Sequence, residues 1–326
     1  MSSCNDGRWL FQTGKGSWHE QIKLDRSVSE HSGLDDMAEI AIITPSYADD
    51  FELCEDCSKS VLEYTPESTV HYIIVPRQDL SRFGRLRNSR TRVLSLDELL
   101  PRHIVNLPGR NLWLNLRRPF PPVRGWVMQQ IVKLMTVEIL DADIIVSIDS
   151  DVVLVRAIRA DTFLTGAGIR FYCKEEAIDD RLPRHVIYHN VARSLLGLPP
   201  AQPPFPDYIH MPSVWDRSTV LALRERIQHV TGRHWIDAVA SRLHVSECIL
   251  YGIFVDEVLG GSEGIVRTDS MLCHNYYETE PLSLEAACEF VSRISNEDFA
   301  IMISAKSRTP LDIRRTALSK APSREA

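Results

Sequence analysis

The sequence has no long apolar run, and its start has no apolar segment of the kind found in secretory signals. A membrane-spanning helix needs about 20 consecutive apolar residues, so we expect no transmembrane segment and a cytoplasmic protein, with peripheral membrane attachment left open. The seven cysteines, an odd number without regular spacing, do not indicate a disulfide framework. The formal net charge of −7 argues against general nucleic-acid binding.

Phosphate-binding loops and internal repeats are also missing. Gly14-Lys15-Gly16-Ser17 has the wrong glycine spacing for a P-loop, and Gly follows the Lys where that motif has Ser or Thr. Residues 1–37 are polar and aperiodic, which predicts a mobile N-terminal arm. With no repeat and no linker, the rest is predicted to form one domain over 38–305, followed by a C-terminal tail over 306–326.

Lysine is absent from a basic segment in the first half of the chain. Between Arg77 and Arg124 there are eleven Arg, no Lys and only three acids. A basic segment on an acidic protein suggests a small anionic partner. A solvated face without a ligand is the alternative, and the sequence does not choose between them.

Apolar periodicity predicts strands that alternate with helices, which indicates an α/β fold with a sheet covered by helices. The first half is predicted to hold strands at 39–47, 70–76 and 92–96 and a helix over 49–64, with Asp49 as its N-cap. The Pro-rich and Arg-rich segment 101–124 is predicted to be a long loop with one short element.

The helix predicted over 126–140 has two different faces. One is an apolar stripe of Val127, Ile131, Leu134 and Met135, and the other carries Trp126, Gln130 and Lys133. The second half is predicted to hold strands at 144–148, 170–175, 208–215 and 299–304, and helices over 185–196, 234–242, 247–258 and 283–294, with another helix capped by Asp216.

The sequence IIVSIDSDVVLV places two acids at the end of an apolar strand. Side chains alternate along a strand, so Asp149 and Asp151 point to one side and Ser150 to the other. Two like charges this close raise one pKa unless a cation is present. Carboxylate oxygens suit Mg²⁺ or Mn²⁺, which keep positions open for substrate phosphates. The alternative is an acidic turn that pairs with a nearby Arg.

A D-x-D after an apolar strand occurs in two enzyme classes. Phosphatases of the haloacid-dehalogenase type use the first Asp as nucleophile, but their motif strand normally opens the fold. The whole layout instead resembles nucleotide-sugar glycosyltransferases of the GT-A fold, in particular a poorly characterised bacterial GT-A-like set, over residues 39–305. The resemblance rests on the strand that ends in Thr44-Pro45-Ser46-Tyr47, on GWVMQQIVKL (125–134) before the D-x-D, on SECILYG (246–252) and on MLCHNYY (271–277).

This resemblance implies a single GT-A-like, Rossmann-type domain with a mixed, mostly parallel sheet. It implies a metal-dependent transfer of a sugar from a nucleotide-sugar donor, a UDP-sugar first, to a hydroxyl acceptor. The expected metal ligands are Asp149, Asp151 and His274, and the expected general base is Glu247, with Asp256 as a rival. The expected donor-binding residues are Thr44, Pro45, Ser46, Tyr47, Gln130, Lys133, Asp149 and Ser150. The alternatives are a D-x-D phosphatase and a non-catalytic nucleotide-sugar-binding protein.

Overall fold

A computed structural model describes residues 38–321 apart from 108–109, 167 and 262–263. All of the described residues belong to one compact unit, Asp35–Ala326. The predicted arm over 1–37 lies outside the described residues.

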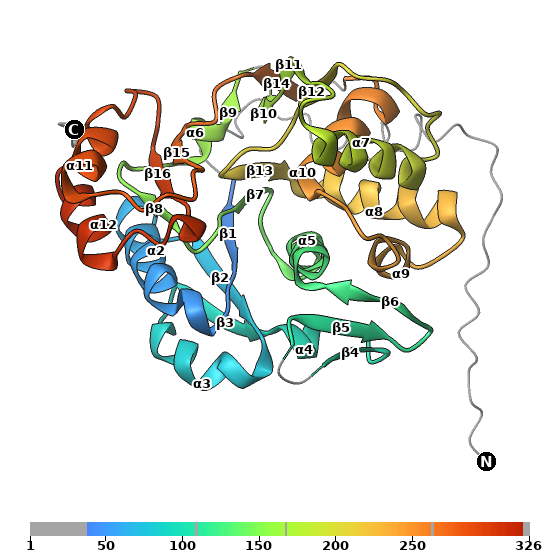
Figure 1. The fold of residues 1–326 in the computed structure, drawn as a ribbon, viewed down its shortest axis with the longest axis horizontal. Helices are drawn as coiled ribbons and strands as arrows, with labels where there is room; N and C mark the ends of the chain where they lie inside the picture. Colours follow the sequence, from blue (N-terminus) through green and yellow to red (C-terminus); the bar gives the residue numbers. More distant parts are fainter. Residues whose placement is uncertain (1–37, 108–109, 167, 262–263, 322–326) are drawn as a thin grey trace. The chain divides into compact units, whose positions relative to one another are not determined.

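A five-stranded sheet in the order β13-β7-β1-β2-β3 forms the centre of this unit (Figure 1). β1 pairs in parallel with β2 and β7, β2 pairs in parallel with β3, and β13 runs antiparallel to β7. Their bounds are β1 Ile40–Pro45, β2 Val70–Val75, β3 Thr91–Ser95, β7 Ile144–Ser147 and β13 Ser213–Asp216. The predicted α/β class, with a mixed and mostly parallel sheet flanked by helices, is confirmed.

Successive residues of β1 enter different apolar clusters, which explains its continuous apolar sequence. Ile40 and Ile42 belong to the cluster that also holds Cys57 and Val61 of α2 (Phe51–Tyr64). Ala41 and Ile43 belong to the cluster that holds the apolar stripe of α5 (Gly125–Thr136). The sheet is thus covered on both faces. The predicted Asp49 cap is wrong, because Asp49 lies in a 3₁₀ turn and α2 begins after Asp50 without a side-chain cap.

The segment predicted as a long loop forms a second, antiparallel sheet in the order β4-β5-β6. The strands are β4 (Ile104–Asn106), β5 (Leu112–Asn115) and β6 (Arg118–Arg124). β6 carries three prolines and lies at the edge of the sheet. An edge strand tolerates proline because one side of its backbone needs no hydrogen-bonding partner.

The second half of the chain adds a group of helices and short strands. Asp216 caps α8 as predicted, since its side chain accepts from the Thr219 N–H. Among the described helices, none is long and apolar enough to cross a membrane. The helices are α7 Pro183–Leu196, α8 Arg217–Thr231, α9 Trp235–Ala240 and α10 Glu247–Ile253, which continues as a π-helix over Phe254–Val258. The strands are β10 Gly168–Tyr172, β11 Lys174–Ile178, β12 Phe205–Asp207 and β14 Gly264–Thr268.

The folded part of the chain does not stop at residue 305. β15 (Cys273–Tyr276), β16 (Ala300–Ile303) and β8 (Val152–Leu154) form a three-stranded sheet. Two helices follow in this part of the chain, α11 (Leu284–Ser292) and α12 (Leu311–Leu318), and both are drawn in red in Figure 1. Arg314 of α12 is buried and donates to the carbonyls of Ile303, Ser304 and Thr309. The predicted tail is therefore wrong for residues 306–321.

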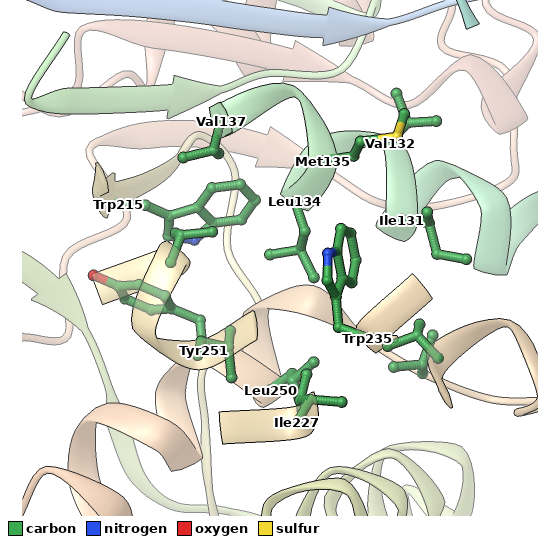
Figure 2. Packing of buried hydrophobic residues seen from close by; sticks show 14 of the residues in the cluster. Ile131, Val132, Leu134, Met135, Val137, Trp215, Ile227, Trp235, Leu250 and Tyr251 are labelled. Carbon is green, nitrogen blue, oxygen red and sulfur yellow. The ribbon is translucent and has the colours of Figure 1, made fainter. Parts of the chain in front are cut away.

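A shared apolar cluster holds α5 against the helices of the second half. Figure 2 shows Leu134 of α5 between the indoles of Trp215 and Trp235, with Leu250 and Tyr251 of α10 nearby. All five residues are buried. Because this packing joins α5 to α10, it also fixes the polar side chains that the two helices carry at their common boundary.

Candidate functional site

A buried lysine joins the three sequence segments that carried the strongest predictions. Lys133 Nζ lies 3.0 Å from Asp149 Oδ1 and 3.0 Å from Glu247 Oε1. Lys133 comes from α5, Asp149 from the loop after β7, and Glu247 from the first turn of α10. Lys133 does not lie on an exposed helix face, since its side chain is only 3% exposed.

The charges around Lys133 keep it protonated. Burial alone would lower the pKa of its ammonium, but the Asp149 and Glu247 carboxylates outweigh burial and raise that pKa. Glu247 is itself buried, while the Asp149 side chain is 36% exposed. The lysine thus bridges an inner acid and an acid that faces solvent.

Glu247 is held in place by the start of its helix. Ser246 is the N-cap of α10, and its hydroxyl accepts from the Ile249 N–H at 3.4 Å. An acid in the first turn is also stabilised by the helix dipole. Lys133 donates to Oε1, and no described residue hydrogen-bonds to Oε2, so this oxygen remains a candidate acceptor.

The two acids of the D-x-D have different partners. Asp149 pairs with Lys133, whereas Asp151 Oδ2 accepts from the Ala305 N–H at 2.6 Å. Burial and the charge of Asp149 raise the pKa of Asp151 to about 6, although Ala305 and Arg314 act in the opposite direction.

A third carboxyl, Asp50, belongs to the same electrostatic group. Burial and the charges of Asp49 and Asp149 raise the pKa of Asp50 to about 6, and Arg314 lowers it. Asp50 and Asp151 are thus incompletely neutralised by the protein. Such a group favours an additional cation.

Asp149 and Asp151 provide some, but not all, of the ligands expected for a divalent cation. Mg²⁺ is commonly held by one or two carboxylates and substrate phosphates, and Asp149 and Asp151 offer that donor chemistry. Within the described residues, however, no group of three or more His, Cys, Asp or Glu is arranged to hold a metal. His274 does not join the two acids, because its ring stacks on Phe290 of α11 at 4.1 Å. The predicted three-residue ligand set is therefore not formed.

The Thr44–Tyr47 segment contains both buried and exposed side chains. Thr44 is buried and shares a 2.9 Å hydrogen bond with His71, so its side chain does not face a ligand. Ser46 is buried and accepts from the Ser150 hydroxyl at 2.8 Å, which ties β1 to the D-x-D loop. Pro45 is half-buried, and Tyr47 is exposed. Of this segment, Tyr47 is the side chain available for a contact with a ligand.

Gln130 is buried one turn before Lys133. Its Nε2 donates to the Trp126 carbonyl at 3.0 Å, and its buried Oε1 has no hydrogen-bonding partner among the described residues. The neighbouring Gln129, which was not predicted, lies 3.5 Å from Asp149 Oδ1 through its Nε2. Gln129 thus adjoins the lysine cluster through Asp149, and Gln130 has a carbonyl oxygen that is not engaged.

Asp256 is not part of this group. Its carboxylate accepts from the Tyr208 hydroxyl at 2.6 Å and pairs with Arg267 at 2.5 Å. No hydrogen bond or ion pair connects it to Lys133, Asp149 or Glu247. These contacts assign Asp256 to packing between the π-helix and its neighbours.

Aromatic side chains lie next to Glu247. Tyr188 of α7 stacks on Trp126 with the ring centroids 6.4 Å apart, and it also contacts the rings of His185 and His244. Trp126 is 44% exposed, and its Nε1 donates to the Val245 carbonyl at 2.8 Å. Burial raises the pKa of the Tyr188 hydroxyl, the Arg184 guanidinium acts in the opposite direction, and the Glu247 carboxylate adds to the rise. An exposed, fixed indole therefore adjoins the candidate base.

Besides Gln129, sequence reasoning missed three residues of this region. Asp50 lies in the predicted helix over 49–64, Arg314 in the predicted tail, and Tyr188 in the predicted helix over 185–196. Only Asp50, which is adjacent to the predicted cap Asp49, carried a usable signal. The other two enter the region through tertiary packing.

Comparisons with known proteins give a family match and distant matches among solved structures, two of which are described below. The model described as "Family of unknown function (DUF6492)" matches residues 38–281. No curated protein matches the sequence. An active-site mutant of LgtC aligns at 13% identity, over 86% of this chain and 95% of that chain, with a TM-score of 0.44. Galactosyltransferase LgtC in complex with donor and acceptor sugar analogues aligns at 11% identity, over 87% and 98%, with a TM-score of 0.44.

At these identities and TM-scores, the structural likeness does not bear on activity. The family match covers most of the chain, from the start of the central sheet to the segment after β15. The chain belongs to the family of unknown function DUF6492.

Proposed function

We propose that this protein is a glycosyltransferase that moves a sugar from a nucleotide-sugar donor to a hydroxyl acceptor. The observation that carries the proposal is the Lys133 bridge between Asp149 and Glu247. Three segments that resemble glycosyltransferase motifs meet at one buried ion-pair cluster. A cluster at the carboxyl ends of parallel strands lies where open α/β sheets bind ligands.

The donor would lie between the D-x-D loop and the end of β1. Asp149 and Asp151 would hold Mg²⁺ or Mn²⁺, which supplies Lewis-acid stabilisation of the diphosphate leaving group. Tyr47 would contact the nucleotide base, and Gln130 Oε1 would accept from a donor hydroxyl. Lys133 would keep Asp149 in position through their ion pair.

The acceptor would lie on the side of Glu247. An acceptor sugar would stack on the exposed indole of Trp126, a contact that suits amphipathic rings. Glu247 Oε2 would take the proton of the acceptor hydroxyl as its oxygen attacks the sugar carbon. The bond between that carbon and the phosphate oxygen would break, and the nucleoside diphosphate would leave with the bonding electrons.

The phosphatase alternative has weaker support. In that reading Asp149 is a nucleophile on the strand that opens the fold, but here β1, β2 and β3 precede β7. β7 also has an antiparallel neighbour, β13. No described contact favours a nucleophilic role for Asp149 over an ion-pair role.

Thermal-shift measurements with UDP-, GDP- and CDP-sugars, each with and without Mn²⁺, test the proposal. We expect one nucleotide class to raise the Tm in a Mn²⁺-dependent manner. Asp149→Asn should abolish this shift, whereas the control Asp161→Asn, at an exposed acid, should keep it. Absence of any shift in the wild-type protein, or an equal loss in both variants, would contradict the proposal.

A further inference from the structure

A second polar hollow lies outside the candidate site. It is a solvent-open cavity of about 360 Å³, lined by Arg118, Thr231, Arg233, Ala238, Ser241 and Arg242. This volume lies within the range of about 300–1,000 Å³ typical of small-molecule sites. The arginines come from β6, from the residues after α8 and from the residues after α9. Tertiary folding thus brings together three cations that are distant in the chain or separated by a helix.

The charges in this cavity are not neutralised by the described part of the protein. None of the three arginines makes an ion pair with a described acid, and no acid lines the cavity. Asp237 of α9 is already engaged by His103, Asn115 and Arg117.

The most enclosed of the three arginines also lacks a full set of partners. Arg242 Nε is buried and has no hydrogen-bonding partner among the described residues. Burial and the charges of Arg118 and Arg233 lower the pKa of Arg242. A buried donor without a partner is costly, so a ligand that accepts from Arg242 would relieve both the unmet hydrogen bond and the repulsion.

Helix ends account for only part of this arrangement. Arg233 and Arg242 follow the C-terminal ends of α8 and α9, where positive charge complements the helix dipole. Arg118 lies on an edge strand and has no helix end of its own. Its convergence with the other two is therefore unexplained by helix capping, whereas a bound anion accounts for all three.

We propose that this cavity binds the phosphate group of an anionic ligand. Guanidinium groups match phosphate oxygens with paired hydrogen bonds, and arginine is favoured where such planar recognition is needed. Phe120, two residues beyond Arg118, is 81% exposed, and Leu116 is 59% exposed. Exposed apolar side chains close in sequence to Arg118 suit a lipid headgroup at a membrane surface, while a soluble phosphate ester would use the arginines alone.

The test compares wild type with Arg118→Gln/Arg242→Gln and with a control of equal charge change, Arg181→Gln/Arg293→Gln. The control arginines are exposed and paired with Asp179 and Glu289, far from the cavity in sequence. Calorimetric titration with inorganic phosphate measures the soluble source. Co-sedimentation with phosphatidylglycerol vesicles, against phosphatidylcholine vesicles, measures the lipid source.

We expect wild type and control to bind at least one source, and the cavity variant to bind it about tenfold or more weakly. Binding of vesicles but not of phosphate assigns a lipid headgroup, and the reverse assigns a soluble phosphate. Equal weakening in the control, or no binding by wild type to either source, overturns the proposal. If the double variant does not fold, Arg118→Gln alone serves, because Arg118 is exposed. Neither arginine contacts the Lys133 cluster, so this result is independent of the proposed transferase activity.

Discussion

Replacing Lys133 by Met removes the shared cation of the buried cluster and keeps most of the side-chain volume. Asp149 and Glu247 each lose a partner at 3.0 Å, and Glu247 is left with a buried charge because it is only 4% exposed. Removal of one member of a buried ion pair typically costs about 3–5 kcal/mol. We therefore expect Lys133→Met to lower the free energy of unfolding at pH 8 by about that amount.

Urea denaturation followed by circular dichroism measures this loss. The control is Lys59→Met, which removes an exposed lysine from a helical pair with Glu55 and should change stability by no more than about 0.5 kcal/mol. In the double variant Lys133→Met/Glu247→Gln the buried charge is gone, so part of the stability should return. The reasoning is refuted if Lys133→Met costs as little as the control, or if the two substitutions in the cluster add independently.

Three further predictions concern other parts of the molecule. Tyr47→Ala should weaken nucleotide binding about tenfold without lowering the Tm, because Tyr47 is exposed; calorimetry on both proteins checks this, and a matching loss of Tm would assign Tyr47 to structure instead. Burial lowers the pKa of His71 to about 3, so between pH 6.5 and 3 the unfolded chain binds a proton that the folded chain does not. The free energy of unfolding should therefore fall by up to about 1.4 kcal/mol per pH unit over this range because of His71. If the slope of unfolding free energy against pH were unchanged in His71→Gln, this prediction would be contradicted. Arg314→Met leaves buried carbonyls without a donor and should cost about 3 kcal/mol in urea unfolding; a loss below about 0.5 kcal/mol would show that α12 does not stabilise the fold.

The central sheet could be predicted from sequence because its signals are local. Runs rich in isoleucine and valine at 40–43 and 144–148, together with the apolar stripe of α5, specify buried strands and a covering helix. The N-caps Asp216 and Ser246 are also local, since each side chain accepts from a backbone N–H three residues later.

The second sheet was missed because proline-rich strands contradict strand propensity. β6 contains prolines at 119, 121 and 122, and only its edge position makes them acceptable. That position depends on tertiary pairing with β5, which no local pattern of residues 101–124 records. The error at 306–321 has a similar origin, because a buried arginine does not look like part of a core.

The candidate site shows the same limit. Sequence position placed Lys133 and Gln130 on one helix face, but it did not indicate that this face is buried against α10. The prediction for His274 followed a resemblance in motif order. Its ring instead packs on Phe290, because alternation along β15 places Cys273 in the cluster around β1 and β7 and points His274 to α11. The order of motifs in the sequence therefore does not determine the direction of a side chain such as His274, which depends on how its strand packs.

The most direct measurement of the central claim is the release of nucleoside diphosphate from UDP-, GDP- and CDP-sugars in the presence of Mn²⁺, followed by mass spectrometry. We expect slow release with one donor class by the wild-type protein, and a strong loss in Glu247→Gln and in Asp149→Asn. The control Glu285→Gln, at an exposed acid in the first turn of a serine-capped helix, should retain the activity. Release of inorganic phosphate with a covalent phosphate on Asp149, or no release from any donor by wild-type protein that binds the donor, would contradict the account.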